Sequence, residues 1–467
     1  MGKPYHHSPS SVDSGYAWVV LASCFVLRAL VDAFWTSLGI LFLKWQTHFD
    51  VSVSNTAWIG SIFMLILLSS APISSALGHR LTYRVTVIGA GIVIFSCLCA
   101  ISLTNQFWQI YMFIPILSFA FGIAGQTGTA YFIVFFDKRL ALANGLNSAA
   151  SAVGILMFPP LMEILISYYG WRGALQITSA IMSNICVCGA LLRNPPKVKR
   201  LRTNSSKSKL VKERIPDEVD SSELDTSCCN SFFKDIARSF DLSLFRKLTF
   251  VFQGIGNGIL YGGNNTAILY LVPYAVSVGI ANMEASYLMF AFGISGLAIR
   301  LCPVGWIVDK KFISASTLGG IAFLMCGLNI VITSFVRTFS GLVIVAVVYG
   351  VTVGVAAFLR VVVVTYAAGS KAKAPGAIGW MLLGEGVGSL ACILLMGFLH
   401  DISGNYRAPL IVSGVCVMCL GINMLLYPLQ VRCQHWIDTA RSRQAILDID
   451  STQNFARLVV TGKETSV

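Results

Sequence analysis

Long apolar stretches alternate with short polar connections along most of the chain. Each of the twelve stretches we find is about twenty or more residues long, which is the length that crosses the hydrocarbon core of a bilayer as a helix. They are residues 16–43, 55–77, 83–103, 107–134, 141–166, 173–192, 247–276, 286–307, 314–336, 339–366, 375–399 and 408–429. The pattern therefore predicts an all-α membrane protein with twelve transmembrane helices.

One long polar segment, residues 194–246, divides these stretches into two groups of six. It begins with basic residues, turns acidic and is rich in serine, which is typical of a disordered linker. The predicted organisation has five parts. They are a cytoplasmic N-terminus (1–15), a six-helix half (16–193), the linker (194–246), a second six-helix half (247–430) and a cytoplasmic tail (431–467).

Sequence echoes relate the two halves. Three positions of the first half recur 234 residues later in the second. They are the pairs Gly145 and Gly379, Val153 and Val387, and Gly154 and Gly388. A parallel repeat of two six-helix halves resembles the organisation of the major facilitator superfamily, in which the substrate site lies near the midplane between the halves. We therefore expect two pseudo-symmetric halves with a site between them.

The charge distribution predicts how the chain sits in the membrane. Only 12% of the residues are charged and 55% are hydrophobic, whereas soluble domains carry about 25% charged residues. Of the 34 lysines and arginines, 27 lie on the side of the N-terminus, 4 lie in connections on the other side and 3 lie within the stretches. The positive-inside rule then places both termini in the cytoplasm, and we expect a multi-pass protein of the plasma membrane. The net charge of +13 indicates this topology and contact with anionic lipids rather than nucleic acid.

The sequence offers no chemistry of an enzyme. It contains no phosphate-binding loop, no nucleophile elbow and no cysteine or histidine spacing typical of a metal site. Most of the 13 cysteines lie within the apolar stretches, where a thiol packs as a small apolar group. We therefore expect no catalytic residues, no metal and no cofactor.

Ionisable residues within the apolar stretches are the candidates for function, because a charge in lipid costs several kcal/mol. There are six. They are Arg28, Asp32, Glu163, Arg300, Arg360 and Glu385. Arg28 and Asp32 stand four residues apart, so they can form an ion pair on one helix face. Such a pair is either structural, or it leaves Asp32 to meet an ammonium group or take up a proton in a cavity.

Arg300 has no acidic residue within one helical turn. A guanidinium without a partner in a cavity is a natural bidentate ligand for a substrate carboxylate. The alternative is a salt bridge to Asp32 or Glu385 in the absence of substrate, which a substrate could then replace.

The other three charged side chains are assigned different roles. Glu385 lies in a glycine-rich stretch and is a candidate for proton coupling, as is Asp32. Arg360 precedes Lys371 by eleven residues, so we expect its side chain to extend towards the cytoplasmic face. Glu163 is expected to be structural, near the outer end of its helix. The glycine-rich region 254–263 should loosen the seventh helix, either as a gate or for close packing.

Two motifs resemble the monocarboxylate transporter family. The entry to the first helix reads Asp13-Ser14-Gly15-Tyr16-Ala17-Trp18, where the family has Asp-Gly-Gly-Trp-Gly-Trp. The corner between the fourth and fifth helices reads Phe135-Phe136-Asp137-Lys138-Arg139-Leu140-Ala141-Leu142-Ala143-Asn144-Gly145, where the family has Tyr-Phe-x-Lys-Arg-Arg-x-Leu-Ala-x-Gly. The resemblance covers the chain from about residue 13 to about residue 427, apart from the linker. It implies a secondary transporter of small organic acids, with a single-span accessory glycoprotein as a partner.

The chain departs from the family at two positions that matter for mechanism. The proton-coupled lactate carriers have a lysine on the first helix and an aspartate four residues before an arginine on the eighth. Here Thr36 and Gly296 stand at those two positions, and Arg300 remains. The resemblance therefore supports anion binding but not the family's proton-coupling pair. Arg300, Asp32, Arg28 and Thr36 are the candidate substrate-binding residues.

Three functions follow from these observations. The first is transport of monocarboxylates or related small organic acids by alternating access. The second is proton-independent facilitated transport of a zwitterionic metabolite, creatine-like or amino-acid-like, because Arg300 and Asp32 together offer one cation and one anion. The third is a non-transporting sensor on the same fold. The chain ends Thr465-Ser466-Val467, which also predicts binding to a PDZ scaffold.

Overall fold

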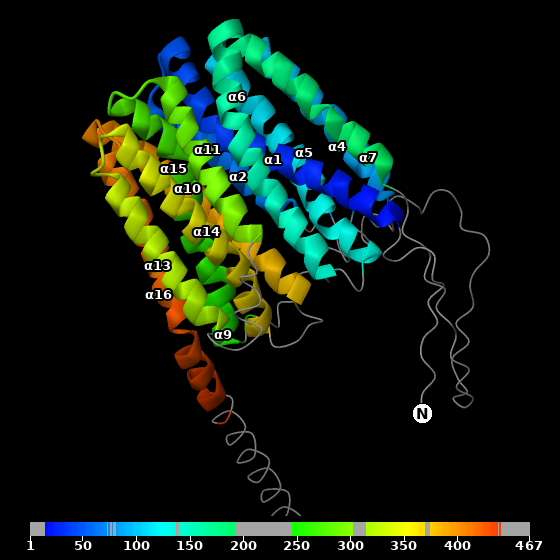
Figure 1. Cartoon of the computed structure of the whole chain (residues 1–467), viewed down its shortest axis with the longest axis vertical. Coiled ribbons are helices and arrows are strands. Elements are labelled where there is room, and N and C mark those ends of the chain that lie inside the picture. The colour runs from blue at the N-terminus through cyan, green and yellow to red at the C-terminus, as the bar shows by residue number, and fades with distance from the viewer. Residues whose placement is uncertain are drawn as a thin grey trace, which may run out of the picture.

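The computed structural model describes residues 15–71, 73–74, 77, 81–136, 140–192, 245, 247–301, 314–368, 374–437 and 439. Helices make up its regular structure throughout these residues, and no strand occurs among them. The N-terminus, most of the predicted linker and the PDZ-type tail lie outside the described residues. Residues 427–437 are also helical and lead away from the bundle (Figure 1).

Within the described residues, seven helical elements build the N-terminal half. They are α1 (Gly15–Phe49), α2 (Val53–Ser69), α4 (Tyr83–Ser102), α5 (Phe107–Tyr131), the short η1 (Phe132–Phe135), α6 (Leu140–Met182) and α7 (Asn184–Leu191). Gly170 interrupts α6 with a left-handed backbone (φ 67°), so α6 is two helices joined at a corner. These two helices are the fifth and sixth predicted spans.

In the part of the C-terminal half that the structure describes, there are eight elements. They are α9 (Leu248–Phe250), η3 (Val251–Gly256), α10 (Asn257–Ser277), α11 (Asn282–Leu301), α13 (Ala315–Thr333), α14 (Phe339–Ala368), α15 (Ala374–Ser403) and α16 (Arg407–Leu425). The η3 element is a turn of π-helix between α9 and α10. The prediction that glycines loosen this helix is therefore correct at its beginning, since π-bulges mark widened helical turns.

Each of the twelve predicted spans corresponds to a helix. In the described part of the chain, nine helical stretches are long and apolar enough to cross a membrane, and one of them contains the corner at Gly170. The helix α2 is shorter, and the α9–η3–α10 helix carries several buried asparagines that lower its hydropathy. The main boundary error is in α1, which continues to Phe49, so that Lys44 lies on a helix and not in an outer loop.

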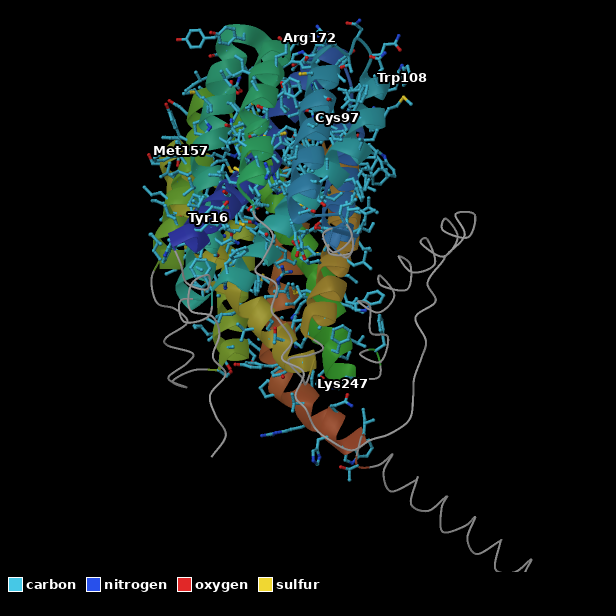
Figure 2. All side chains as sticks on the ribbon, turned by 90° about the vertical axis from the view of Figure 1, so that its right-hand side faces the viewer. Tyr16, Cys97, Trp108, Met157, Arg172 and Lys247 are labelled. Carbon is cyan, nitrogen blue, oxygen red and sulfur yellow. The ribbon has the colours of Figure 1, made fainter. Side chains whose placement is uncertain are left out.

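The two halves lie side by side. Figure 1 shows the blue-to-teal helices of the first half against the green-to-orange helices of the second, with α2 next to α15 and α6 next to α11. We call the face where α1 begins the proximal face, and the face where α1 ends the distal face. In Figure 2, Arg172 and Trp108 lie at one end of the bundle and Lys247 lies at the other.

Pseudo-symmetry appears at the repeated glycines. A Cβ on Gly154 of α6 would overlap the backbone of Ala29 on α1, and a Cβ on Gly388 of α15 would overlap the backbone of Ile259 on α10. Gly170 and Gly404, which are 234 residues apart, both turn the chain with φ 67°. Glycine is needed at these corners because L side chains rarely adopt that conformation. The sparse sequence repeat therefore reflects equivalent packing in the two halves.

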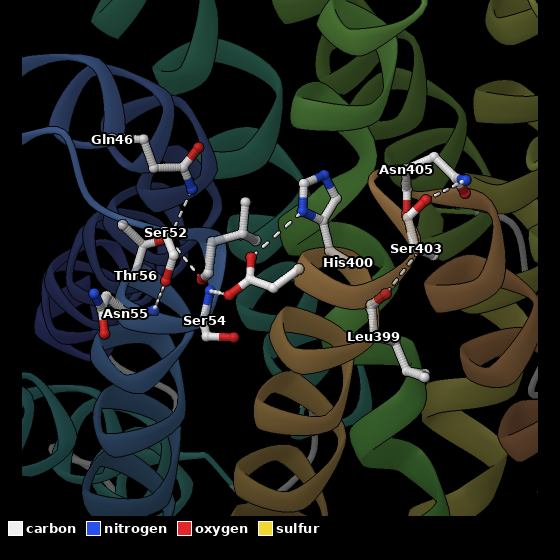
Figure 3. A network of polar contacts seen from close by, with 11 residues as sticks. Gln46, Ser52, Ser54, Asn55, Thr56, Leu399, His400, Ser403 and Asn405 are labelled. Atoms are coloured by element: carbon white, nitrogen blue, oxygen red, sulfur yellow. Dashed lines mark hydrogen bonds and ion pairs between the residues drawn. The ribbon is translucent and has the colours of Figure 1, made fainter.

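The halves meet tightly at the distal face (Figure 3). Asp401, at the end of α15, accepts a hydrogen bond from the backbone amide of Ser54 at 3.2 Å, while Ser52 accepts one from the amide of Asn55 at 3.3 Å. Two of the free amides at the beginning of α2 are thus capped, one of them by the other half of the protein. A Cβ on Gly397 would lie 2.9 Å from the Cα of Ser54, so the two helices are in direct contact there.

Candidate functional site

An ion pair on α1 forms the first part of the site. Arg28 donates through Nε to Asp32 Oδ2 at 2.7 Å, one helical turn away, as the spacing predicted. Their side chains are 35% and 18% exposed, so the pair is partly accessible. It sits on a helix whose surrounding positions are mostly buried, and it is locally neutral.

Arg300 approaches this pair from the other half. It lies on α11, and its Nη1 donates to the backbone carbonyl of Ser148 on α6 at 3.3 Å. The carboxylate of Asp32 attracts the Arg300 guanidinium, and the guanidinium of Arg28 repels it more weakly. Within the described residues Arg300 forms no ion pair, so the alternative of a salt bridge to Asp32 or Glu385 is wrong for this conformation. We call Arg28, Asp32 and Arg300 the Arg300 cluster.

Thr36 and Gly296 have structural surroundings. The hydroxyl of Thr36 is buried and donates to the carbonyls of Asp32 and Ala33 on its own helix, at 3.0 and 3.2 Å. Gly296 faces Gly350, and a Cβ at 296 would lie 3.4 Å from the Gly350 carbonyl oxygen. Thr36 thus lies one helical turn after Asp32, and its hydroxyl is bonded to the backbone of its own helix. Gly296 lies where α11 packs against α14.

A second group of polar residues lies within the C-terminal half. Arg360 on α14 donates through Nη2 to Glu385 Oε2 on α15 at 2.7 Å. Arg360 is 5% exposed and Glu385 is 6% exposed. The expectation that Arg360 extends towards the cytoplasmic face is therefore wrong, because a buried carboxylate on the neighbouring helix holds the guanidinium inside the bundle.

Three further side chains complete this group. Asn265 donates through Nδ2 to Glu385 Oε1 and to Ser389 Oγ, both at 3.0 Å. The guanidinium carbon of Arg360 lies 3.7 Å from the centre of the Tyr261 ring, which is a cation–π contact. Tyr261 is also within electrostatic reach of Arg300. We call Arg360, Glu385, Asn265, Ser389 and Tyr261 the Glu385 cluster.

Glycines on two helices create the space for the Glu385 cluster. On α10, a Cβ at Gly258 or Gly262 would overlap the backbone of α15; on α15, a Cβ at Gly388 would overlap the backbone of α10. These small residues recur every four positions, so the two backbones approach closely along one face of each helix. Close approach places the short side chain of Asn265 in contact with Glu385. The glycine-rich stretch around Glu385 thus has a packing reason.

Glu163 is the remaining acidic residue, and it is bound from another helix. Lys44 Nζ lies 3.5 Å from Glu163 Oε1, and Glu163 is buried. This contact joins α1 to α6 within the N-terminal half and fits the structural role expected from the sequence.

The formal charges of the two clusters differ. Arg28, Asp32 and Arg300 sum to +1, whereas Arg360 and Glu385 sum to zero. The Arg300 cluster therefore carries one uncompensated positive formal charge, and Arg300 lies on α11 where that helix contacts α6 of the other half. Sequence reasoning singled out Arg360 but missed its pairing with Glu385, and it missed the neutral members of the Glu385 cluster. The adjacent Asn264 and Asn265 in an otherwise apolar stretch were the available signal.

Comparison with protein families supports a transporter. The family model described as Major Facilitator Superfamily matches residues 24–374. Monocarboxylate transporter 12 of Xenopus laevis is 27% identical over 434 residues, which cover 90% of this chain and 91% of that protein. Monocarboxylate transporter 3 of Gallus gallus is 28% identical over 429 residues, covering 89% and 79%. Monocarboxylate transporter 2 of Homo sapiens is 27% identical over 435 residues, covering 91% and 87%.

Solved structures agree with the fold. A peptide transporter, POT, in complex with sulfate matches with a TM-score of 0.68 at 11% identity, covering 88% of this chain and 95% of that one. A point mutant of the nucleoside transporter NupG matches with a TM-score of 0.62 at 12% identity, covering 88% and 100%. The matched relatives are transporters and not enzymes. The chain belongs to the Major Facilitator Superfamily, and the relatives named above are monocarboxylate transporters that share 27–28% of their residues with it.

Proposed function

We propose that this protein carries monocarboxylates or related small organic acids across the plasma membrane by alternating access, and that Arg300 binds the substrate carboxylate. One observation carries this proposal. Arg300 lies where α11 meets the other half, and among the described residues its only hydrogen-bond partner is the carbonyl of Ser148, at the long distance of 3.3 Å. Its remaining N–H groups are available to a carboxylate.

The charge of the Arg300 cluster favours a monoanion. A bound monocarboxylate neutralises the formal charge of +1, and this reduces the cost of enclosing the site between the halves, away from water. Alternating access fits the position of the cluster, because a substrate held between the halves becomes accessible from either side when the halves rock against each other.

The closed distal face supports the same mechanism. Asp401 and Ser54 join the halves there, as do the backbones around Gly397. The distribution of basic residues supports a cytoplasmic proximal face, with both termini in the cytoplasm and anionic lipid around the basic segments. In this orientation the structure is closed towards the outside.

Substitution of Arg300 tests the proposal. We expect both Arg300→Ala and Arg300→Lys to lower lactate or pyruvate uptake at least about tenfold, because charge-assisted hydrogen bonds contribute about 1.5–3 kcal/mol and a lysine cannot bind a carboxylate through two parallel N–H groups. Radiolabelled uptake in oocytes, normalised to surface biotinylation, measures this. The matched control is Arg337→Ala, which removes an exposed arginine far along the chain from the cluster. Normal uptake in the Arg300 variants would refute the carboxylate-binding role.

Asp32 favours a second candidate function, because its carboxylate acts on Arg300 and could receive the ammonium group of a zwitterion. Saturable, pH-independent uptake of a creatine-like or amino-acid-like solute would support that function. Surface expression without uptake of any solute in such a panel would support a non-transporting sensor. The proposed partners, a single-span accessory glycoprotein and a PDZ scaffold binding Thr465–Val467, are tested by co-purification with the intact chain and with a chain lacking its last three residues.

A further inference from the structure

The Glu385 cluster has no part in carboxylate binding by Arg300, although it places a complete ion pair within the membrane-spanning bundle. Buried ion pairs cost desolvation energy, and replacing one with apolar residues is often neutral or stabilising. Ionisable residues at this depth commonly belong to ion or proton pathways. The Arg360–Glu385 pair therefore calls for a role beyond packing.

The surroundings of Glu385 suit both protonation states of its carboxyl group. When ionised, Glu385 accepts hydrogen bonds from Arg360 at 2.7 Å and from Asn265 at 3.0 Å. A side-chain amide carries both a donor and an acceptor group. A half-turn of the Asn265 amide would present its oxygen to the O–H of a protonated Glu385. The cluster can thus lose or gain a proton without leaving the carboxyl group unpaired.

Arg360 keeps one contact when its partner is neutralised. Its Nε and Nη1 are buried and have no hydrogen-bond partner among the described residues, so protonation of Glu385 removes its main partner and favours movement of the guanidinium. The Tyr261 ring covers it at 3.7 Å, and a cation–π contact persists when Glu385 is neutral. Tyr261 in turn lies within electrostatic reach of Arg300, which connects the two clusters.

Few other charges face Glu385. Arg360 approaches from α14, Asn265 and Tyr261 approach from α10, and Ser389 follows on α15 itself. The helix α2 packs against α15 at Gly386 through Leu65, and Val53–Ser69 contains no charged residue. Arg360 is thus the one formal charge in contact with Glu385 in the described part of the chain.

From this geometry we propose that Glu385 is the proton-binding site of the carrier and that Arg360 is the cation it releases on protonation. The inference rests on the proposed transport of organic acids. Uptake of one proton changes Glu385 from carboxylate to carboxylic acid and raises the summed charge of both clusters from +1 to +2. Binding of one monoanion at Arg300 returns the sum to +1. The empty and the loaded carrier then have the same charge, so proton and anion cross together. This pair replaces the lysine and aspartate that are absent at Thr36 and Gly296.

Reconstituted full-length protein separates coupling from carboxylate movement. One assay measures uphill accumulation of labelled lactate driven by an acid-outside pH gradient. The other measures exchange of external labelled lactate for internal unlabelled lactate at equal pH. For Glu385→Gln, which keeps the side-chain shape but leaves the Arg360 charge without its carboxylate, we expect no accumulation above the equilibrium ratio. For the double variant R360Q/E385Q, which removes both charges, we expect exchange within about twofold of wild type and again no accumulation.

The other possible results contradict either this inference or the proposed function, and the two cases can be distinguished. Accumulation by Glu385→Gln would show that the proton binds elsewhere. Loss of exchange in both variants, or recovery of both activities in the double variant, would show that the pair serves substrate movement or structure. Wild-type exchange without a response to the pH gradient would exclude proton coupling and leave the proposed function intact. Absence of exchange in the wild-type protein, with any organic acid, would instead refute the proposed function.

Discussion

At the scale of single residues, two ion pairs with the same chemistry have different surroundings. Arg28 and Asp32 form a local pair that is partly accessible, so water can solvate either partner alone. Arg360 and Glu385 form a buried pair between helices, where removing one partner leaves a charge that costs about 3–5 kcal/mol. We therefore expect single substitutions at Asp32 to change function without preventing folding.

Asp32→Asn distinguishes the two candidate substrates. Asp32 is the strongest charge acting on Arg300, so it competes with a substrate carboxylate for the guanidinium. Its neutralisation should lower the KM for a monocarboxylate several-fold and raise the KM for a zwitterion. Concentration-dependent uptake of lactate and of an amino-acid-like solute measures both values. Arg28→Gln is the matched control, because it removes the other charge of the pair. A higher KM for lactate in Asp32→Asn would contradict the monoanion assignment.

At the scale of helices, α10 and α15 pack against each other through glycines on their facing sides. Gly262 and Gly388 bring the two backbones together, and the π-helical turn of η3 precedes this contact. The approach is what allows Asn265 to contact Glu385 directly. Any side chain at these glycines must separate the helices.

Gly388→Ala should destabilise the C-terminal half, because its Cβ would overlap the backbone of Ile259. Overpacking of this kind typically costs about 1–3 kcal/mol. Thermal unfolding in detergent, followed by thiol reactivity of the buried cysteines, should show a lower Tm. Gly89→Ala on α4 is the matched control, since no atom lies within 4 Å of a Cβ there. Equal Tm values for the two variants would contradict the close packing of α10 against α15.

At the scale of the whole molecule, the distal contact between the halves depends on the side chain of Asp401 at the end of α15. Its Oδ2 accepts a hydrogen bond from the backbone amide of Ser54 at 3.2 Å, and its Oδ1 lies 3.7 Å from His400 Nδ1. A carboxylate accepts a stronger hydrogen bond than a neutral amide, so removing the charge should weaken this contact.

Asp401→Asn should therefore open the distal face. Spin labels at Asn55 and Ile402, at the ends of α2 and α15, report the separation of the halves in nanodiscs. We expect the short-distance population to be lower in Asp401→Asn than in the wild type at neutral pH. Ser403→Ala serves as the control, since its hydroxyl bonds within α15 and its adjoining turn. Distances unaffected by Asp401→Asn would exclude the carboxylate as a determinant of closure.

Several features were available from the sequence because they depend on local properties. Twelve apolar stretches give twelve helices, since an unpaired backbone in lipid forces each crossing segment to bond to itself. The Arg28–Asp32 pair followed from a spacing of one helical turn. The two halves followed from repeated positions, among which Gly154 and Gly388 mark close contacts of the backbone.

The features that the sequence did not reveal depend on contacts between distant segments. Arg360 and Glu385 are 25 residues apart and Asn265 is 120 residues from Glu385, so no spacing rule joins them. The direction of a long side chain such as Arg360 depends on whether a neighbouring helix offers a carboxylate, and this produced the error in its placement. The sequence by itself determined the spans, the pseudo-symmetry and the presence of a cation suited to a carboxylate, since these arise from composition and local geometry. Only the tertiary structure decided which charges are paired and which remain available to a ligand, because that depends on how closely the helices pack.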